Sequence, residues 1–275
     1  MKKKIYLSLL LILILNNEGY ISILNPGGKI CLEQKYLIFI STLLMLIIVI
    51  PVIFMTLYFY YKYRERKKKL EYKPDWDYSK KVEVVIWGVP IMIILILGII
   101  TWKSTHELAP QKQIIYNNNN VINVEVISLD WKWLFIYNKI GIATINQLVL
   151  PIKVPIELKI TSETVMNSFF IPQLCSQMYA MAGMKNKNFL MSNKKGNYIG
   201  MSTNFSGKGF SGMKFKVLVV SLKNFERWIK KIKEYKKNIN YKILLKETIN
   251  NKIEYYSSLE KKYLKLLINK GVERC

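Results

Sequence analysis

The chain has 275 residues and a formal net charge of +24, from 42 lysines and arginines against 18 aspartates and glutamates. Three scattered cysteines, Cys31, Cys175 and Cys275, have no C-x-x-C spacing and do not indicate a disulfide framework. A single histidine, His106, argues against a haem or imidazole metal site built by this chain alone. The lysine, asparagine and isoleucine bias is typical of an A+T-rich gene, so the charge is either a solvated surface or a face for an anionic partner.

The first 18 residues have the pattern of a secretory signal. Three lysines precede an apolar core at residues 5–15, which is too short to cross a bilayer. The alternative is a segment that stays uncleaved as an anchor. Residues 19–35 then form an outer N-terminal segment with a turn cluster at residues 25–28.

Residues 36–102 are predicted to form a transmembrane hairpin. The runs 36–61 and 84–102 contain no charged residue, and each is close to or above the ~20 residues that a spanning helix needs. The alternative, a pair of buried soluble helices, rarely stays uncharged over such lengths. Pro51 and Pro90 lie inside the runs, which membrane helices tolerate when neighbouring helices satisfy the freed backbone groups.

The loop at residues 62–83 sets the orientation of the hairpin. It carries nine lysines and arginines against five acidic residues, so it is predicted to be cytoplasmic. The chain on both sides then lies outside the cytoplasm, where no nucleic acid is expected. Glu83, at the edge of the second span, is either a solvated interfacial carboxylate or a group that takes up protons.

After a polar linker at residues 103–120, the hydrophobic period changes to two. Apolar and polar residues alternate at 122–126, 154–160 and 213–219, with glycines and prolines between these segments. This pattern predicts a β-sandwich or barrel over residues 121–220. Residues 221–275 return to a helical period, with amphipathic stretches at 222–235 and 243–267.

Four sequence blocks, in their order and spacing, resemble subunit II of haem-copper oxidases. They are E-x-x-x-W-x-x-P at 83–90, a W-x-W segment at 130–137, and the segments 165–172 and 200–213. The resemblance begins near residue 25 and runs to the end of the chain. It implies a membrane-anchored α+β protein: a two-helix transmembrane hairpin, then a cupredoxin-like β-sandwich and a short helical C-terminal region.

The resemblance fails at the positions that bind copper in cytochrome c oxidases. There a loop of the pattern C-S-E-x-C-G-x-x-H-x-x-M, with an upstream histidine, holds a binuclear copper centre. The matching positions here are Asn167 and Phe210 for the histidines, Ser202 and Ser206 for the cysteines, Asn204 for the glutamate, and Met213, the one side-chain ligand retained. Hydroxyl and phenyl groups are poor copper ligands, so no metal is expected in this chain.

This departure resembles the cytochrome bo-type ubiquinol oxidases. The resemblance implies a complex in the bacterial inner membrane that oxidises ubiquinol, reduces oxygen to water and pumps protons. Its haems and copper would belong to subunit I, and this subunit would anchor it without a cofactor of its own. The matching glutamate of the family, Glu83 here, lies at the mouth of a proton pathway. Trp131 and Trp133 are expected to serve packing.

Two other functional classes remain open. One is a membrane-anchored copper electron-transfer subunit of a cytochrome c oxidase-like complex, with the soft donors Cys175, Met178, Met181, Met184 and Met213 as an unorthodox site. Methionines at such spacing are also ordinary core residues. The other class is a membrane-tethered binding module without a respiratory role, which would purify without haem.

Overall fold

The computed structural model describes residues 24–64, 79–109, 121–235, 237, 244 and 252–257. The signal-like segment, most of the charged loop and most of the linker lie outside these residues. The chain divides into two compact units. One combines Met1–Glu33 with Pro110–Cys275, and the other is Gln34–Ala109.

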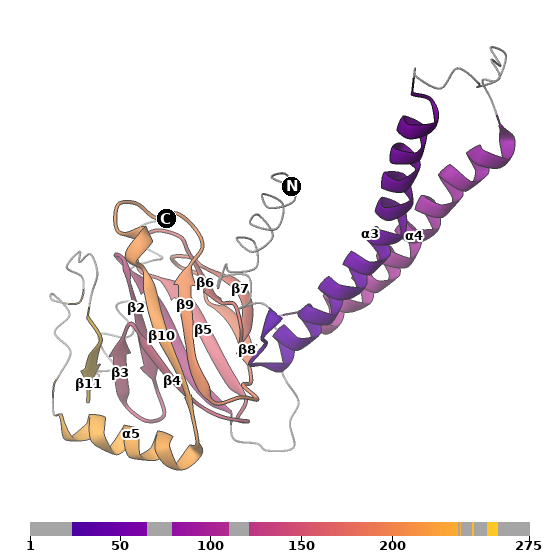
Figure 1. Cartoon of the computed structure of the whole chain (residues 1–275). Helices are drawn as coiled ribbons and strands as arrows, with labels where there is room; N and C mark the ends of the chain where they lie inside the picture. The colour runs from indigo at the N-terminus through magenta and orange to yellow at the C-terminus, as the bar shows by residue number, and fades with distance from the viewer. Residues whose placement is uncertain are drawn as a thin grey trace, which may run out of the picture. The chain divides into compact units, whose positions relative to one another are not determined.

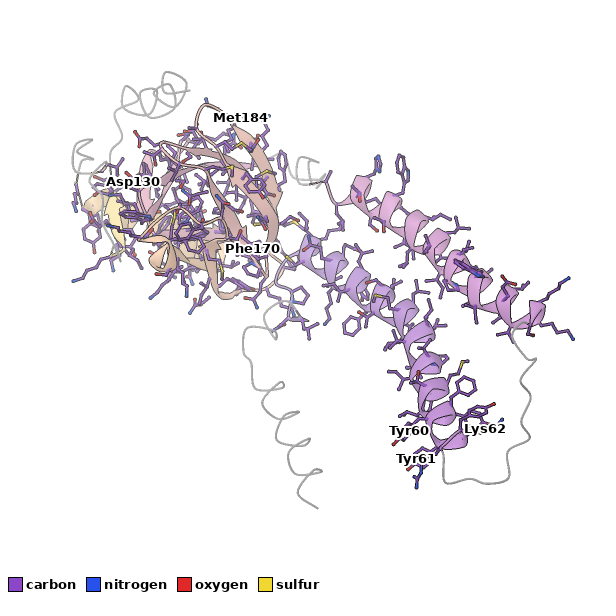
Figure 2. The ribbon with its side chains drawn as sticks, turned by 90° about the horizontal axis from the view of Figure 1, so that it is seen from above. Tyr60, Tyr61, Lys62, Asp130, Phe170 and Met184 are labelled. Atoms are coloured by element: carbon purple, nitrogen blue, oxygen red, sulfur yellow. The ribbon has the colours of Figure 1, made fainter. Side chains whose placement is uncertain are left out.

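Two long helices confirm the predicted hairpin (Figure 1). Helix α3 spans Lys29–Lys62 and helix α4 spans Lys80–Glu107, so both extend beyond the uncharged runs. Each contains its proline, and most of their apolar side chains are exposed. A helix that is apolar all round and uncovered by its own chain is suited to lipid or to another membrane subunit. In Figure 2, Tyr60, Tyr61 and Lys62 lie together at the loop end of α3.

The linker expected at residues 103–120 begins later than the sequence indicates. Helix α4 continues through His106, whose Nδ1 lies 2.8 Å from the carbonyl oxygen of Trp102. The two rings also contact each other, with centroids 4.5 Å apart. His106 is therefore part of the helix end.

The predicted β-sandwich is confirmed, and its strands lie within residues 122–220 and 254–256 (Figure 1). One sheet has the order β11-β3-β2-β1-β5-β8 and the other β4-β10-β9-β6-β7. The strands are β1 (Ile122–Leu129), β2 (Lys132–Tyr137), β3 (Ile142–Ile145), β4 (Gln147–Pro151), β5 (Ile156–Ser162), β6 (Asn167–Ile171), β7 (Cys175–Ala180), β8 (Asn186–Leu190), β9 (Gly196–Ser202), β10 (Lys214–Val220) and β11 (Glu254–Tyr256). All three alternating segments lie largely in strands: β1, β5 and β10.

Aromatic side chains from both sheets form the centre of the core. Phe169 of β6 stacks on Phe215 of β10 with ring centroids 5.2 Å apart, and Trp133 of β2 meets Phe169 edge-on at 5.4 Å. Such pairs add about 0.5–1.5 kcal/mol each beyond the burial of their area. The Phe215 ring is seated against Gly200 of β9, where an added Cβ would lie 2.0 Å from the ring. These contacts pack side chains of the two sheets against each other.

The described residues of the C-terminal region include one helix, one strand and a further helical residue, Leu244. Helix α5 (Leu222–Glu234) is capped by Ser221, whose Oγ accepts from the backbone N–H of Asn224, and it packs Phe225 and Trp228 on Tyr137. The expected helix at 243–267 is wrong at residues 254–256, which form strand β11 instead.

Tertiary pairing explains this correction. Strand β11 runs antiparallel to the edge strand β3, and the Tyr255 hydroxyl donates to Oε1 of Gln147. Glu254 accepts from Lys237 Nζ at 3.0 Å and from the Tyr256 hydroxyl at 2.6 Å. A free sheet edge and these side-chain bonds outweigh an amphipathic period read from sequence.

Candidate functional site

The six positions that match copper ligands gather at one end of the sandwich. Asn167 opens strand β6 and Ser202 closes the neighbouring strand β9. The loop between β9 and β10 carries the other four, with a short 3₁₀ helix, η1 (Phe210–Gly212), just before Met213. The structure therefore brings together the six positions that the resemblance singled out.

Asn167 is the centre of a buried hydrogen-bond network. Its Nδ2 donates to the hydroxyl of Ser128 at 2.7 Å, and its Oδ1 accepts from the hydroxyl of Ser202 at 3.1 Å. Asn167, Ser128 and Ser202 are 1%, 0% and 6% exposed. A buried polar group costs free energy unless it is hydrogen-bonded. In this network each side chain supplies a hydrogen-bond partner to its neighbour and so lowers the cost of burying it. Ser128 was not expected in the site, since it belongs to no motif.

Further hydrogen bonds join the first part of the β9–β10 loop to strand β6 and the residue before it. The hydroxyl of Ser202 also lies 3.3 Å from the carbonyl of Asn204, and Nδ2 of Asn204 donates to the carbonyl of Met166 at 3.0 Å. Nearby, Thr203 Oγ1 donates to Ser168 Oγ at 2.9 Å. These neutral hydrogen bonds join the loop to strand β6.

Ser206, Phe210 and Met213 fill the other half of the loop. The Ser206 hydroxyl lies 4.0 Å from the sulfur of Met213, which is 1% exposed. The Phe210 ring contacts Phe205 at a centroid distance of 5.7 Å. The retained thioether of Met213 therefore lies beside a hydroxyl, and Phe210, at the position of the second histidine, packs against another aromatic ring.

Trp131 is held under this loop. Its Nε1 donates to the carbonyl of Ser206 at 3.1 Å, and the backbone of Gly209 lies so close that an added Cβ would be 2.2 Å from Cγ of the indole. Trp131 has φ +56°, in the left-handed region that non-glycine residues seldom adopt. Glycine at position 209 leaves room for this close approach, and the sequence analysis did not detect it. The structure thus places Trp131 in packing against the loop, and it buries Trp133 completely in the core.

The donor set at these positions does not fit a binuclear copper centre. It consists of amides, hydroxyls, a phenyl ring and one thioether, whereas copper centres of this kind rely on thiolates and imidazoles. Within the described ranges, no three residues among His, Cys, Asp and Glu cluster in a way that could hold a metal ion.

The alternative set of soft donors is spread over different environments. Cys175 is buried, and burial raises the pKa of its thiol. Met213 is buried with Ser206 in the loop, whereas Met184 is 53% exposed and lies at the edge of the domain in Figure 2. An exposed thioether and a protonated core thiol do not make a shared metal site.

Glu83 lies far from this loop in sequence and belongs to the helical unit. It is in the first turn of α4, where its backbone N–H donates to the carbonyl of Ser79 at 3.0 Å. Its side chain is exposed.

Comparison with known proteins identifies relatives along most of the chain. Residues 101–220 match the family described as cytochrome c oxidase subunit II, periplasmic domain. Subunit 2 of the cytochrome bo(3) ubiquinol oxidase of Buchnera aphidicola subsp. Schizaphis graminum (strain Sg) is 48% identical over 95% of this chain and 92% of its own length. The Pseudomonas putida subunit of the same name is 43% identical over 90% of this chain and 80% of its own length.

A further relative extends the same similarity. The subunit of this name from Buchnera aphidicola subsp. Baizongia pistaciae (strain Bp) is 49% identical, over 90% of this chain and 88% of its own length. Identity at this level over most of both lengths is decisive for the family. The chain belongs to the subunit 2 family of cytochrome bo(3) ubiquinol oxidases.

Proposed function

We propose that this chain is the anchoring, non-catalytic subunit II of a proton-pumping ubiquinol oxidase, which oxidises ubiquinol and reduces oxygen to water. The observation that carries the proposal is the buried network around Asn167, in an outer domain of this family. Amide and hydroxyl groups occupy, and hydrogen-bond across, the space where copper-binding relatives would need thiolates and imidazoles. A domain without these donors supports a partner's chemistry and carries no electrons itself.

In this proposal the haems and copper are bound by subunit I, and electrons reach them directly from ubiquinol in the membrane. The hairpin of α3 and α4 supplies the contact with that subunit. Its exposed apolar side chains and its two prolines suit helices that are packed against others within a bilayer. The many lysines and arginines of the loop support a cytoplasmic position for it. In this proposal the N-terminus and the β-domain lie on the periplasmic side of the bacterial inner membrane.

Purification of the assembled complex in a gentle detergent tests this function. We expect haem, copper and ubiquinol oxidation to accompany this chain, and copper to stay with the partner when the subunits are separated. Stoichiometric copper retained by this chain would favour the electron-transfer alternative. A chain that purifies without haem or oxidase activity would favour the binding module instead.

For Glu83 we propose a role at the entrance of a proton pathway into subunit I. An ionisable side chain at the end of a membrane helix can take up protons from the cytoplasm, and nothing in the described helices covers this one. We expect Glu83→Gln to slow turnover and proton uptake by several-fold. Glu107→Gln, at the other end of the same helix, is the matched control and should leave both rates unchanged. Equal rates for the two variants would exclude the role.

A further inference from the structure

The segment before the first membrane helix is built into the β-domain. The backbone N–H groups of Gly27 and Gly28 both donate to the carbonyl of Gln173, at 2.9 and 3.1 Å, and the N–H of Asn193 donates to the carbonyl of Gly27 at 2.8 Å. A Cβ at Gly28 would lie 2.8 Å from the carbonyl oxygen of Leu174. The segment therefore lies tightly against the turn that joins β6 to β7, within the same compact unit.

This contact brings two cysteines to the same turn. Cys31, in the first turn of α3, is 3% exposed and its thiol donates to the carbonyl of Pro172 at 3.4 Å. Cys175 opens β7, is fully buried, and stands opposite Ile171 in the β6–β7 register. The Cys175 thiol hydrogen-bonds to the backbone of Ile171, so the two sulfurs lie against neighbouring residues of one turn.

The electrostatics agree with this proximity. Burial raises the pKa of the Cys175 thiol, and a charge on Cys31 would raise it further. A thiol in such surroundings is normally an inert core residue, so burial alone would assign neither cysteine a role. Two thiols at one buried contact are a different case in a compartment that oxidises thiols, because such compartments favour persistent disulfides.

We propose that Cys31 and Cys175 form a disulfide that fastens the start of helix α3 to the β-domain. The inference rests on the proposed function, which places this domain in the periplasm. Cys275 is then the odd thiol of the chain. Because α3 continues from Cys31 into the membrane-spanning unit, the bond would fix the point where the chain leaves the domain.

The chemistry requires a dithiol oxidant, for which we name the periplasmic class of thiol oxidases that carry a reactive disulfide. One cysteine thiolate attacks that disulfide and forms a mixed disulfide, and the second cysteine then displaces the oxidase. One S–S bond forms in this chain, and the oxidase takes up the two electrons and two protons as its dithiol. Since burial raises the thiol pKa, the exchange must occur before the N-terminal segment packs on the turn.

Counting free thiols in the full chain tests the proposal. Cells are quenched in acid, and the complex is denatured without reductant and treated with a maleimide of known mass before intact-mass analysis. We expect one label on the wild-type chain and three after reduction. The Cys275→Ser variant should take no label before reduction and two after it, whereas Cys175→Ser should take two in both states.

Three labels on the unreduced wild-type chain would overturn the proposal. Two labels on unreduced Cys275→Ser would also overturn it, because Cys31 and Cys175 would then be free. The wild-type and Cys275→Ser counts need no change at the buried contact, so misfolding of Cys175→Ser cannot obscure the result. Haem content and ubiquinol oxidation are measured on a parallel native sample. An active complex with three labels refutes the disulfide alone, and absence of haem refutes the proposed function whatever the label count.

Discussion

Replacing Asn167 by alanine tests whether the network at the loop is a structural substitute for a metal. The change removes the donor to Ser128 and the acceptor for Ser202, both within the core. A buried polar group that loses its partner costs about 1–3 kcal/mol. The Ser202 hydroxyl can turn to the Asn204 carbonyl 3.3 Å away, which offsets part of its loss. We therefore expect the free energy of unfolding to fall by about 2–4 kcal/mol, including the small cavity.

Pulse proteolysis of the purified complex in a urea series measures this loss, with the intact outer domain detected on a blot. Asn197→Ala is the matched control, because Asn197 is exposed on the neighbouring strand β9. An exposed substitution of this kind usually changes stability by no more than about 0.5 kcal/mol. If Asn167→Ala and Asn197→Ala unfold at the same urea concentration, the network contributes nothing to stability and the reasoning fails.

Three other predictions use the same domain. Gly209→Ala drives a methyl group into the Trp131 indole and should cost about 1–3 kcal/mol by urea pulse proteolysis, whereas exposed Lys208→Ala should not. We expect no copper to bind, so copper salts or chelators should leave the unfolding midpoint unchanged. Copper bound at 100 times its Kd would instead stabilise the domain by about 2.7 kcal/mol. The hydrogen bond from Tyr256 lowers the pKa of Glu254. The Glu254 carboxylate therefore contributes fully to folding stability above its ordinary pKa of about 4.3, and this contribution is lost as pH falls through the lowered pKa. Glu254→Gln should therefore flatten the fall in thermal midpoint below pH 4.3, and an unchanged fall would contradict this assignment.

The fold followed from the sequence wherever one physical signal dominated. Two uncharged runs of membrane length predicted two long helices, and an apolar period of two predicted β-strands. The structure has both. The stretch at 243–267 lacked such a signal. Its apolar spacing suits a helix, but the free edge of β3 and the bond from Tyr255 to Gln147 made part of it a strand. Pairing partners far along the chain are not encoded in a local period.

The resemblance indicated which positions of the chain form the site, but the sequence did not show which hydrogen bonds hold the loop in place. The resemblance implied that Asn167, Ser202 and Met213 lie near one another, and the structure joins them by hydrogen bonds. The resemblance could not show that Ser128 completes the hydrogen bonding, since that serine sits in an ordinary strand pattern. The proximity of the two cysteines was equally hidden. Cys31 and Cys175 have no informative spacing, and only the packing of the N-terminal segment on the β6–β7 turn brings them near each other.

Loss of a metal removes stabilisation as well as redox chemistry, so a domain that evolves without one needs replacement contacts at the same place. Metal binding stabilises a folded site because the unfolded chain cannot form it. In this chain the loop is held by the Asn167 network, the Trp131 indole under Gly209, and the Met213 side chain beside Ser206. These contacts are short-range and neutral, so they hold the loop closed without a bound ion and independently of redox state.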